Sequence, residues 1–159
     1  MEAAASQQGP PTPDPALRAF DPFVGTWSMM GHLLGSDEEN IVGQATFRWL
    51  EGGFFLVQDI ELDFAGRFEV KSHELVGYDP ETKAFPSLVF SSLVPTPLPY
   101  TWDVKNRAVT IAVNYGPLDA TFKGEMSEDR KTFSGGWRPN PGADETVNVP
   151  YDIAGTRLE

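Results

Sequence analysis

The chain has 159 residues, which suits one domain with a sizeable core, and it contains no cysteine. The lack of cysteine excludes disulfides, thiolate nucleophiles and cysteine-based metal sites, and it fits a reducing compartment. The net charge of −11, with no run of basic residues, argues against nucleic acid or an anionic membrane surface as partners, because both attract cationic side chains.

No apolar segment approaches the roughly 20 residues of a membrane-spanning helix. The N-terminus also lacks the cationic and apolar regions of a secretory signal. We therefore expect a cytoplasmic protein. Eleven Phe, four Trp and four Tyr, together with 15 Gly and 14 Pro, favour an all-β domain with many turns.

In chain order, the first segment is a Pro-rich stretch over residues 1–16, which we predict to be a disordered leader. Residues 17–159 then form the predicted domain. It begins with Leu17, Phe20 and Phe23, whose three-residue spacing predicts a short helical turn. Such a turn would plug one end of a barrel.

Ten period-2 runs follow, and each predicts a strand. They cover about residues 24–34, 41–50, 54–64, 67–78, 85–94, 99–104, 107–114, 119–126, 131–138 and 146–157. Short links rich in Gly, Pro, Asn and Asp join them, which favours antiparallel neighbours. The pattern predicts a single up-and-down antiparallel β-barrel, because closure removes the exposed edges of such a long sheet.

Alternation along these strands predicts an interior that mixes large aromatic side chains with Gly and Ala. A barrel of about ten strands with such an interior has room for a cavity, because diameter grows with strand number. The runs at 54–64 and 85–94 are ambiguous, since both of their faces carry apolar residues. The predicted ligand-binding residues are Phe47, Trp49, Phe68, Glu74, Trp102, Tyr115, Phe122 and Trp137.

Three blocks carry a family resemblance: Phe23–Trp27 (FVGTW), Trp49–Leu56 (WLEGGFFL) and Gly77–Lys83 (GYDPETK). In order and spacing they resemble an uncharacterised family of bacterial lipocalin-like (calycin-like) proteins, over about residues 20–157. More distantly, the chain is similar to nitrobindin-like and fatty-acid-binding-protein-like barrels. The resemblance implies a barrel with a small-molecule cavity, and it transfers no catalytic residue.

The calycin resemblance also implies a role for Trp27. In such barrels a basic side chain from the last strand lies across the first-strand tryptophan at the closed end. Arg157 is the matching candidate, because it has the same parity as Tyr151 and Ile153. We favour a structural closure of the barrel by Trp27 and Arg157. The alternative is that Arg157 binds a ligand carboxylate.

The two histidines, His32 and His73, have the parity of outward-facing residues. A metal site built from His73, Asp59 and Glu61 is conceivable but lacks a converging pattern. Nitrobindin-like barrels bind haem through a histidine in the C-terminal part of the chain, and this sequence has none after position 73. We therefore predict no metal and no cofactor.

Glu74 is the most informative ionisable residue, because its parity places it inside the barrel, where burial raises the pKa of a carboxyl group. We predict a carrier or sensor that binds a small apolar or aromatic molecule, and lean against an enzyme. The alternatives are a cavity enzyme of the isomerase or cyclase type, with Glu74 partnered by Tyr78 or Tyr115, and a filled barrel that serves as an interaction module. A homodimer remains open.

The segment 93–100 carries three alternating prolines. It is read either as a stiff connector between strands or as a lip over the barrel mouth. Ser91 and Ser92 have no Gly-x-Ser-x-Gly setting and no histidine partner, so the sequence does not support a hydrolase triad.

Overall fold

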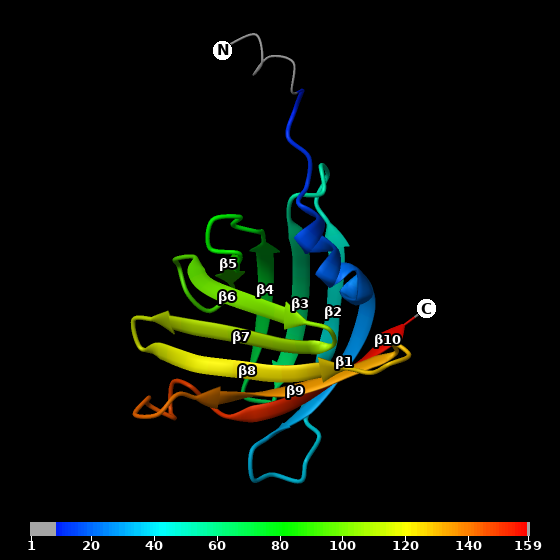
Figure 1. Ribbon diagram of the computed structural model, residues 1–159. Coiled ribbons are helices and arrows are strands. Elements are labelled where there is room, and N and C mark those ends of the chain that lie inside the picture. The colour runs from blue at the N-terminus through cyan, green and yellow to red at the C-terminus, as the bar shows by residue number, and fades with distance from the viewer. Residues whose placement is uncertain (1–8, 159) are drawn as a thin grey trace.

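A computed structural model of the chain describes residues 9–158, so the first eight residues of the predicted leader lie outside the described residues. Ten strands form one closed antiparallel barrel with a short 3-10 helix ahead of them, which confirms the predicted fold (Figure 1). The elements are η1 (Pro15–Phe23), β1 (Gly25–Leu33), β2 (Ile41–Trp49), β3 (Leu56–Phe64), β4 (Phe68–Val76), β5 (Phe85–Ser91), β6 (Leu98–Lys105), β7 (Ala108–Tyr115), β8 (Leu118–Met126), β9 (Thr132–Pro139) and β10 (Tyr151–Leu158).

Each strand pairs with the next along the chain, and β10 returns to pair with β1. The pairing of every neighbouring couple runs without a bulge in the described residues. Because side chains alternate between the two faces of a strand, an unbroken register keeps inside and outside consistent around the whole barrel.

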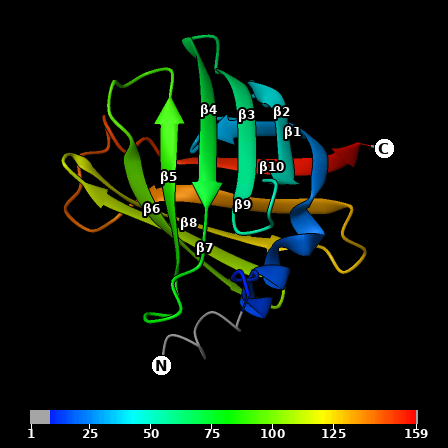
Figure 2. The same ribbon diagram turned by 90° about the horizontal axis from the view of Figure 1, so that it is seen from above.

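Helix η1 closes one end of the barrel (Figure 2). Asp14 caps it by accepting a hydrogen bond from the Ala16 amide at 2.8 Å, and Pro15 supplies a φ suited to the first helical position. The helix therefore begins two residues before the predicted turn. Its buried residues are Leu17, Phe20 and Phe23, the three-residue series seen in the sequence.

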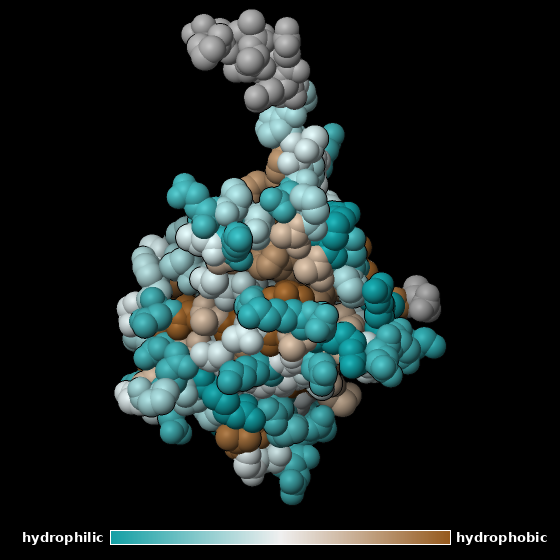
Figure 3. Space-filling view, viewed as in Figure 1, coloured by the Kyte–Doolittle hydropathy of each residue, from teal (hydrophilic) through white to brown (hydrophobic). Residues whose placement is uncertain are grey.

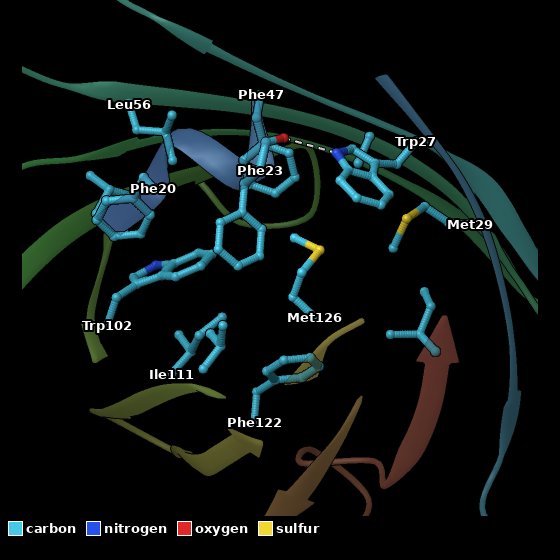
Figure 4. Packing of buried hydrophobic residues seen from close by; sticks show 14 of the residues in the cluster. Phe20, Phe23, Trp27, Met29, Phe47, Leu56, Trp102, Ile111, Phe122 and Met126 are labelled. Atoms are coloured by element: carbon cyan, nitrogen blue, oxygen red, sulfur yellow. Dashed lines mark hydrogen bonds between the residues drawn. The ribbon is translucent and has the colours of Figure 1, made fainter. Parts of the chain in front are cut away.

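The aromatic residues of η1 enter the interior of the barrel. Phe20 is fully buried, with its ring edge-on to Phe85 at 4.9 Å and to Trp102 at 5.7 Å between centroids. Figure 4 shows Phe20 and Phe23 reaching from η1 toward Trp102 and Ile111. The closed end of the barrel is thus filled by these side chains.

The last predicted strand differs most from the structure, because β10 begins at Tyr151 rather than near residue 146. Residues 140–150 form a loop that Asn148 fastens to the β7–β8 turn. Its Oδ1 accepts from the Asp119 amide at 2.8 Å, and its Nδ2 donates to the Pro117 and Asp144 carbonyls at 3.1 and 3.0 Å. These bonds hold the backbone away from the ladder until Tyr151.

Hydrophilic side chains cover most of the face seen in Figure 3, with apolar patches between them. No helix in the described part of the chain combines the length and apolar character needed to cross a membrane.

Candidate functional site

An inner chamber of about 200 Å³ lies in the barrel beyond the η1 plug. Its surface is mainly aromatic and aliphatic and includes Phe23, Phe47, Ile60, Trp102, Ile111 and Phe122. Phe23 comes from η1, so the helix that fills the closed end also forms part of the chamber floor. A surface of this kind favours apolar ligands, because they lose little hydration on entry.

An outer chamber of about 260 Å³ adjoins the inner one. Phe64, Phe68, Val147 and Val149 are among its lining residues. Tyr100, Trp137 and Tyr151 line both chambers, and we call these three residues the aromatic partition. Within it, Tyr100 and Trp137 meet edge to face with 5.9 Å between ring centroids. The partition therefore separates the inner chamber from the barrel mouth.

Glu74 projects from β4 into the inner chamber and is only 6% exposed. Its Oε2 atom accepts two hydrogen bonds, from the Ser87 hydroxyl at 2.7 Å and from Trp102 Nε1 at 2.8 Å. Burial raises the pKa of the Glu74 carboxyl above its ordinary value of 4.5, and these two donors offset the increase only in part. The site thus favours the neutral acid more strongly than water does.

Other polar groups line the same chamber. Gln58 is the cross-strand partner of Glu74 on β3, and Ser72 precedes Glu74 by two residues on β4. Burial, and secondarily the nearby Glu74 charge, raise the pKa of Tyr100 to about 12, so its hydroxyl stays protonated at neutral pH. Burial also raises the pKa of Tyr151. A small set of hydrogen-bonding groups therefore converges on an otherwise apolar space.

The structure brings most of the predicted ligand-binding residues to these chambers. Those lining the inner chamber are Phe47, Glu74, Trp102, Phe122 and Trp137, whereas Phe68 lines the outer chamber.

Trp49 and Tyr115 lie elsewhere. Trp49 faces η1, where its Nε1 donates to Asp21 Oδ1 at 3.2 Å and the Arg18 guanidinium lies 4.7 Å from its ring centroid. Tyr115 is 47% exposed at the end of β7, beyond the part of the strand that lines the chambers.

Sequence reasoning missed Ser87 as the partner of Glu74 and expected Tyr78 or Tyr115 instead. Tyr78 packs on Phe85 with 5.1 Å between ring centroids and lines neither chamber. At the barrel mouth, Pro95–Pro99, the segment that a lip would require, lines neither chamber, whereas residues 147–149 line the outer chamber. The useful signal for Ser87 was a small polar residue at an inward position of β5, which the apolar residues on both faces of that strand obscured.

The other predicted pair, Trp27 and Arg157, meets at the closed end. Trp27 is fully buried, and its Nε1 donates to the Phe23 carbonyl at 2.9 Å (Figure 4). The Arg157 guanidinium lies 4.3 Å from the centroid of the Trp27 ring. Arg157 also donates to the backbone carbonyls of Pro22, Val24 and Arg130. All of these acceptors belong to the protein, so the guanidinium is engaged in holding η1, β1 and β10 together.

The histidines lie away from the chambers. His73 Nδ1 contacts Asp59 Oδ1 at 2.5 Å, while Glu61 pairs with Lys71 at 3.4 Å. His32 lies between Glu39 and Asp152 on another face. Over residues 9–158, no group of three or more His, Asp or Glu side chains is arranged to hold a metal ion.

The fold and site define a ten-stranded antiparallel barrel with an aromatic inner chamber and one buried carboxyl group. The chain belongs to the DUF1579 family of proteins of unknown function, whose sequence profile matches residues 12–131. Among solved structures, it is similar to the crystal structure of Rv2717c from M. tuberculosis, with 13% identity, a TM-score of 0.46, and coverage of 92% of this chain and 99% of that chain. A search of curated proteins found no match.

Proposed function

We propose that the protein binds a small apolar or aromatic molecule in the inner chamber and acts as a carrier or sensor. The observation that carries the proposal is the chamber itself, a largely aromatic and aliphatic space of about 200 Å³ inside the barrel with a buried carboxyl group in its wall. Ligand sites typically combine such an apolar surface with a few placed polar groups.

The volume sets the size of the ligand. An apolar cavity of about 150 Å³ is large enough to bind benzene. At about 200 Å³, the inner chamber suits a molecule with one ring and a short substituent. A longer ligand would have to displace the aromatic partition and extend into the outer chamber.

Binding of toluene tests the proposal, because toluene is apolar and has one ring. Tryptophan fluorescence and methyl NMR shifts report occupancy, since Trp102 and Trp137 line the chamber. We expect saturable binding by the wild-type protein. Val89→Phe fills the chamber from β5 and should weaken binding by about tenfold or more, a difference of about 1.4 kcal/mol.

Leu88→Phe is the matched control, because Leu88 is the neighbouring residue on β5 and is 45% exposed on the outer face. It should bind toluene like the wild type. The proposal is rejected if the wild type shows no saturable binding, or if the two variants lose affinity equally while both remain folded by circular dichroism.

A second candidate function, a cavity enzyme, is favoured by the raised pKa of Glu74. Burial raises the pKa of the Glu74 carboxyl, and a carboxyl group with a raised pKa is suited to general acid catalysis. Such an enzyme would lose turnover in Glu74→Gln, because the amide has a similar shape but cannot transfer the proton. Turnover that survives this substitution would remove Glu74 from the mechanism.

A further inference from the structure

The two oxygens of Glu74 have different surroundings. Oε2 accepts from both Ser87 and Trp102, so it is the oxygen that acts as an acceptor. No hydrogen bond reaches Oε1 from residues 9–158. Within that range, the only fully enclosed side-chain oxygen or nitrogen without a partner is Asn40 Oδ1, so Glu74 Oε1 borders open space. Because Glu74 lines the inner chamber, that space is the chamber.

The position of the proton follows from these contacts. With two donors directed at Oε2, a protonated Glu74 carries its hydrogen on Oε1, from which it points toward the chamber. The group therefore presents a hydrogen-bond donor, rather than an acceptor, to whatever occupies the space.

The charges around the chamber support the neutral form of Glu74. Among the described residues that line it, none is Lys, Arg, His or Asp, and Glu74 is the only Glu. The other titratable groups are Tyr100 on β6 and Tyr151 on β10, and burial raises the pKa of both hydroxyls. No fixed cation therefore faces Glu74, and an ionised carboxylate would be buried without a countercharge.

We infer that the inner chamber takes a neutral one-ring molecule with a carbonyl-type acceptor, which receives hydrogen bonds from Glu74 Oε1 and the Tyr100 hydroxyl. This inference rests on the proposed binding function and specifies the ligand class for the same site. Tyr100 lines the same chamber as Glu74, and an ionised Glu74 would raise the pKa of the Tyr100 hydroxyl further. A buried neutral carboxylic acid beside a tyrosine is a known way of holding a carbonyl oxygen or its anion.

The competing ligand class is a cationic amine. It would require Glu74 to ionise, and aromatic rings would then help to hold the ammonium group. The Tyr100 hydroxyl can donate to a carbonyl oxygen while Glu74 stays neutral, whereas an ammonium ligand requires a buried carboxylate to form first. The geometry therefore favours the neutral acceptor, and the two classes predict opposite effects of pH.

Three probes of matched shape separate these cases: acetophenone, cumene and 1-phenylethylamine. They present a carbonyl, a hydrocarbon branch and an ammonium group, respectively, next to the same ring. Affinities are measured by calorimetry over pH 5–9 with wild type, Glu74→Gln and Glu69→Gln. Glu69 is an exposed residue on the same strand, so its variant controls for the change of net charge.

For the wild type at low pH, we expect acetophenone to bind roughly tenfold more tightly than cumene, the order of one buried hydrogen bond. This preference should decline as pH rises and Glu74 ionises. In Glu74→Gln, the amide oxygen takes the two donors and the amide nitrogen donates into the chamber, so the preference should remain and lose its pH dependence. Glu69→Gln should behave as the wild type.

Equal affinity for acetophenone and cumene overturns the inference while leaving the proposed function intact. Tightest binding of 1-phenylethylamine, increasing with pH and lost in Glu74→Gln, also overturns it and assigns a cation site. Failure of all three probes while toluene still binds overturns this inference alone, and failure of toluene as well removes the proposed function.

Discussion

The Arg157 guanidinium lies 4.3 Å from the centroid of the Trp27 ring, and these two residues join the last strand to the first. The same guanidinium donates to Val24 O at 2.7 Å and to Arg130 O at 3.0 Å. One side chain therefore stabilises the barrel seam, the end of η1 and the β8–β9 turn.

Replacement of Arg157 should destabilise the fold, although Arg157 does not line the inner chamber. Arg157→Met loses the cation–π contact and leaves several backbone carbonyls without donors, so we expect a loss of about 2–4 kcal/mol. Urea unfolding followed by tryptophan fluorescence measures it. Arg67→Met in the exposed β3–β4 turn is the control, and a loss of similar size there would mean that charge alone matters.

Gly25 should resist substitution for a related reason. Its φ is +137°, and a Cβ at this position would lie 2.5 Å from Arg157 Nη1. Gly25→Ala should therefore cost about 1–3 kcal/mol through backbone strain and displacement of Arg157. Gly35→Ala is a useful comparison, because Gly35 also has a positive φ of +87° but no atom within 4 Å of its added Cβ. Thermal unfolding should show the larger decrease in Tm for Gly25→Ala, and equal decreases would exclude the steric contribution.

Stability should fall with rising pH because of Glu74. Its folded-state pKa lies above the ordinary value of 4.5, so the folded protein retains a proton that the unfolded chain releases. The stabilising contribution is complete below about 4.5 and is lost as pH rises through the folded-state pKa.

Urea unfolding at a series of pH values checks this prediction. Glu74→Gln should flatten the profile above pH 5, whereas Glu69→Gln should keep the wild-type slope. If Glu74→Gln and the wild type have parallel profiles, the carboxyl group is not buried as described.

Truncation of Phe20 should both destabilise the barrel and enlarge its cavity. Phe20 is fully buried between Phe85 and Trp102, and Phe→Ala changes in cores cost about 3–5 kcal/mol. Phe90→Ala makes the same chemical change at a side chain that is 43% exposed on β5, and it should cost far less. Denaturant unfolding compares the two. A small effect of Phe20→Ala would show that η1 is not part of the cooperative core.

The barrel and much of the chamber could be predicted from the sequence because the strands of residues 9–158 contain no bulge. Unbroken alternation carried Glu74 and Trp102 to the inside on their own strands. On β5, Leu88, Val89 and Phe90 are consecutive and apolar, so alternation did not predict which of them face the barrel interior. The strand faces Ser87 and Val89 inward and leaves Leu88 and Phe90 exposed, and that orientation depends on its neighbours in the sheet.

At two positions, Trp49 and Asn148, the alternation of apolar and polar residues did not predict where the structure places the residue. Trp49 has inward parity, but η1, far away in the sequence, covers it through Asp21 and Arg18. Asn148 lies in a run that alternates like a strand, yet its hydrogen bonds to Asp119, Pro117 and Asp144 keep residues 146–150 out of the sheet. Both outcomes depend on contacts with residues about 30 positions away in the sequence, which alternation along one strand does not report.

The pairing of β1 with β10 also constrains how the chain can fold during synthesis. The ladder joins Thr26 to Leu158 and Leu33 to Tyr151, so the first strand waits for a partner that is made more than a hundred residues later. Until the ribosome has produced β10, β1 and β9 each have an edge open to pairing with other chains. The nascent barrel is therefore most vulnerable to aggregation just before its last strand emerges.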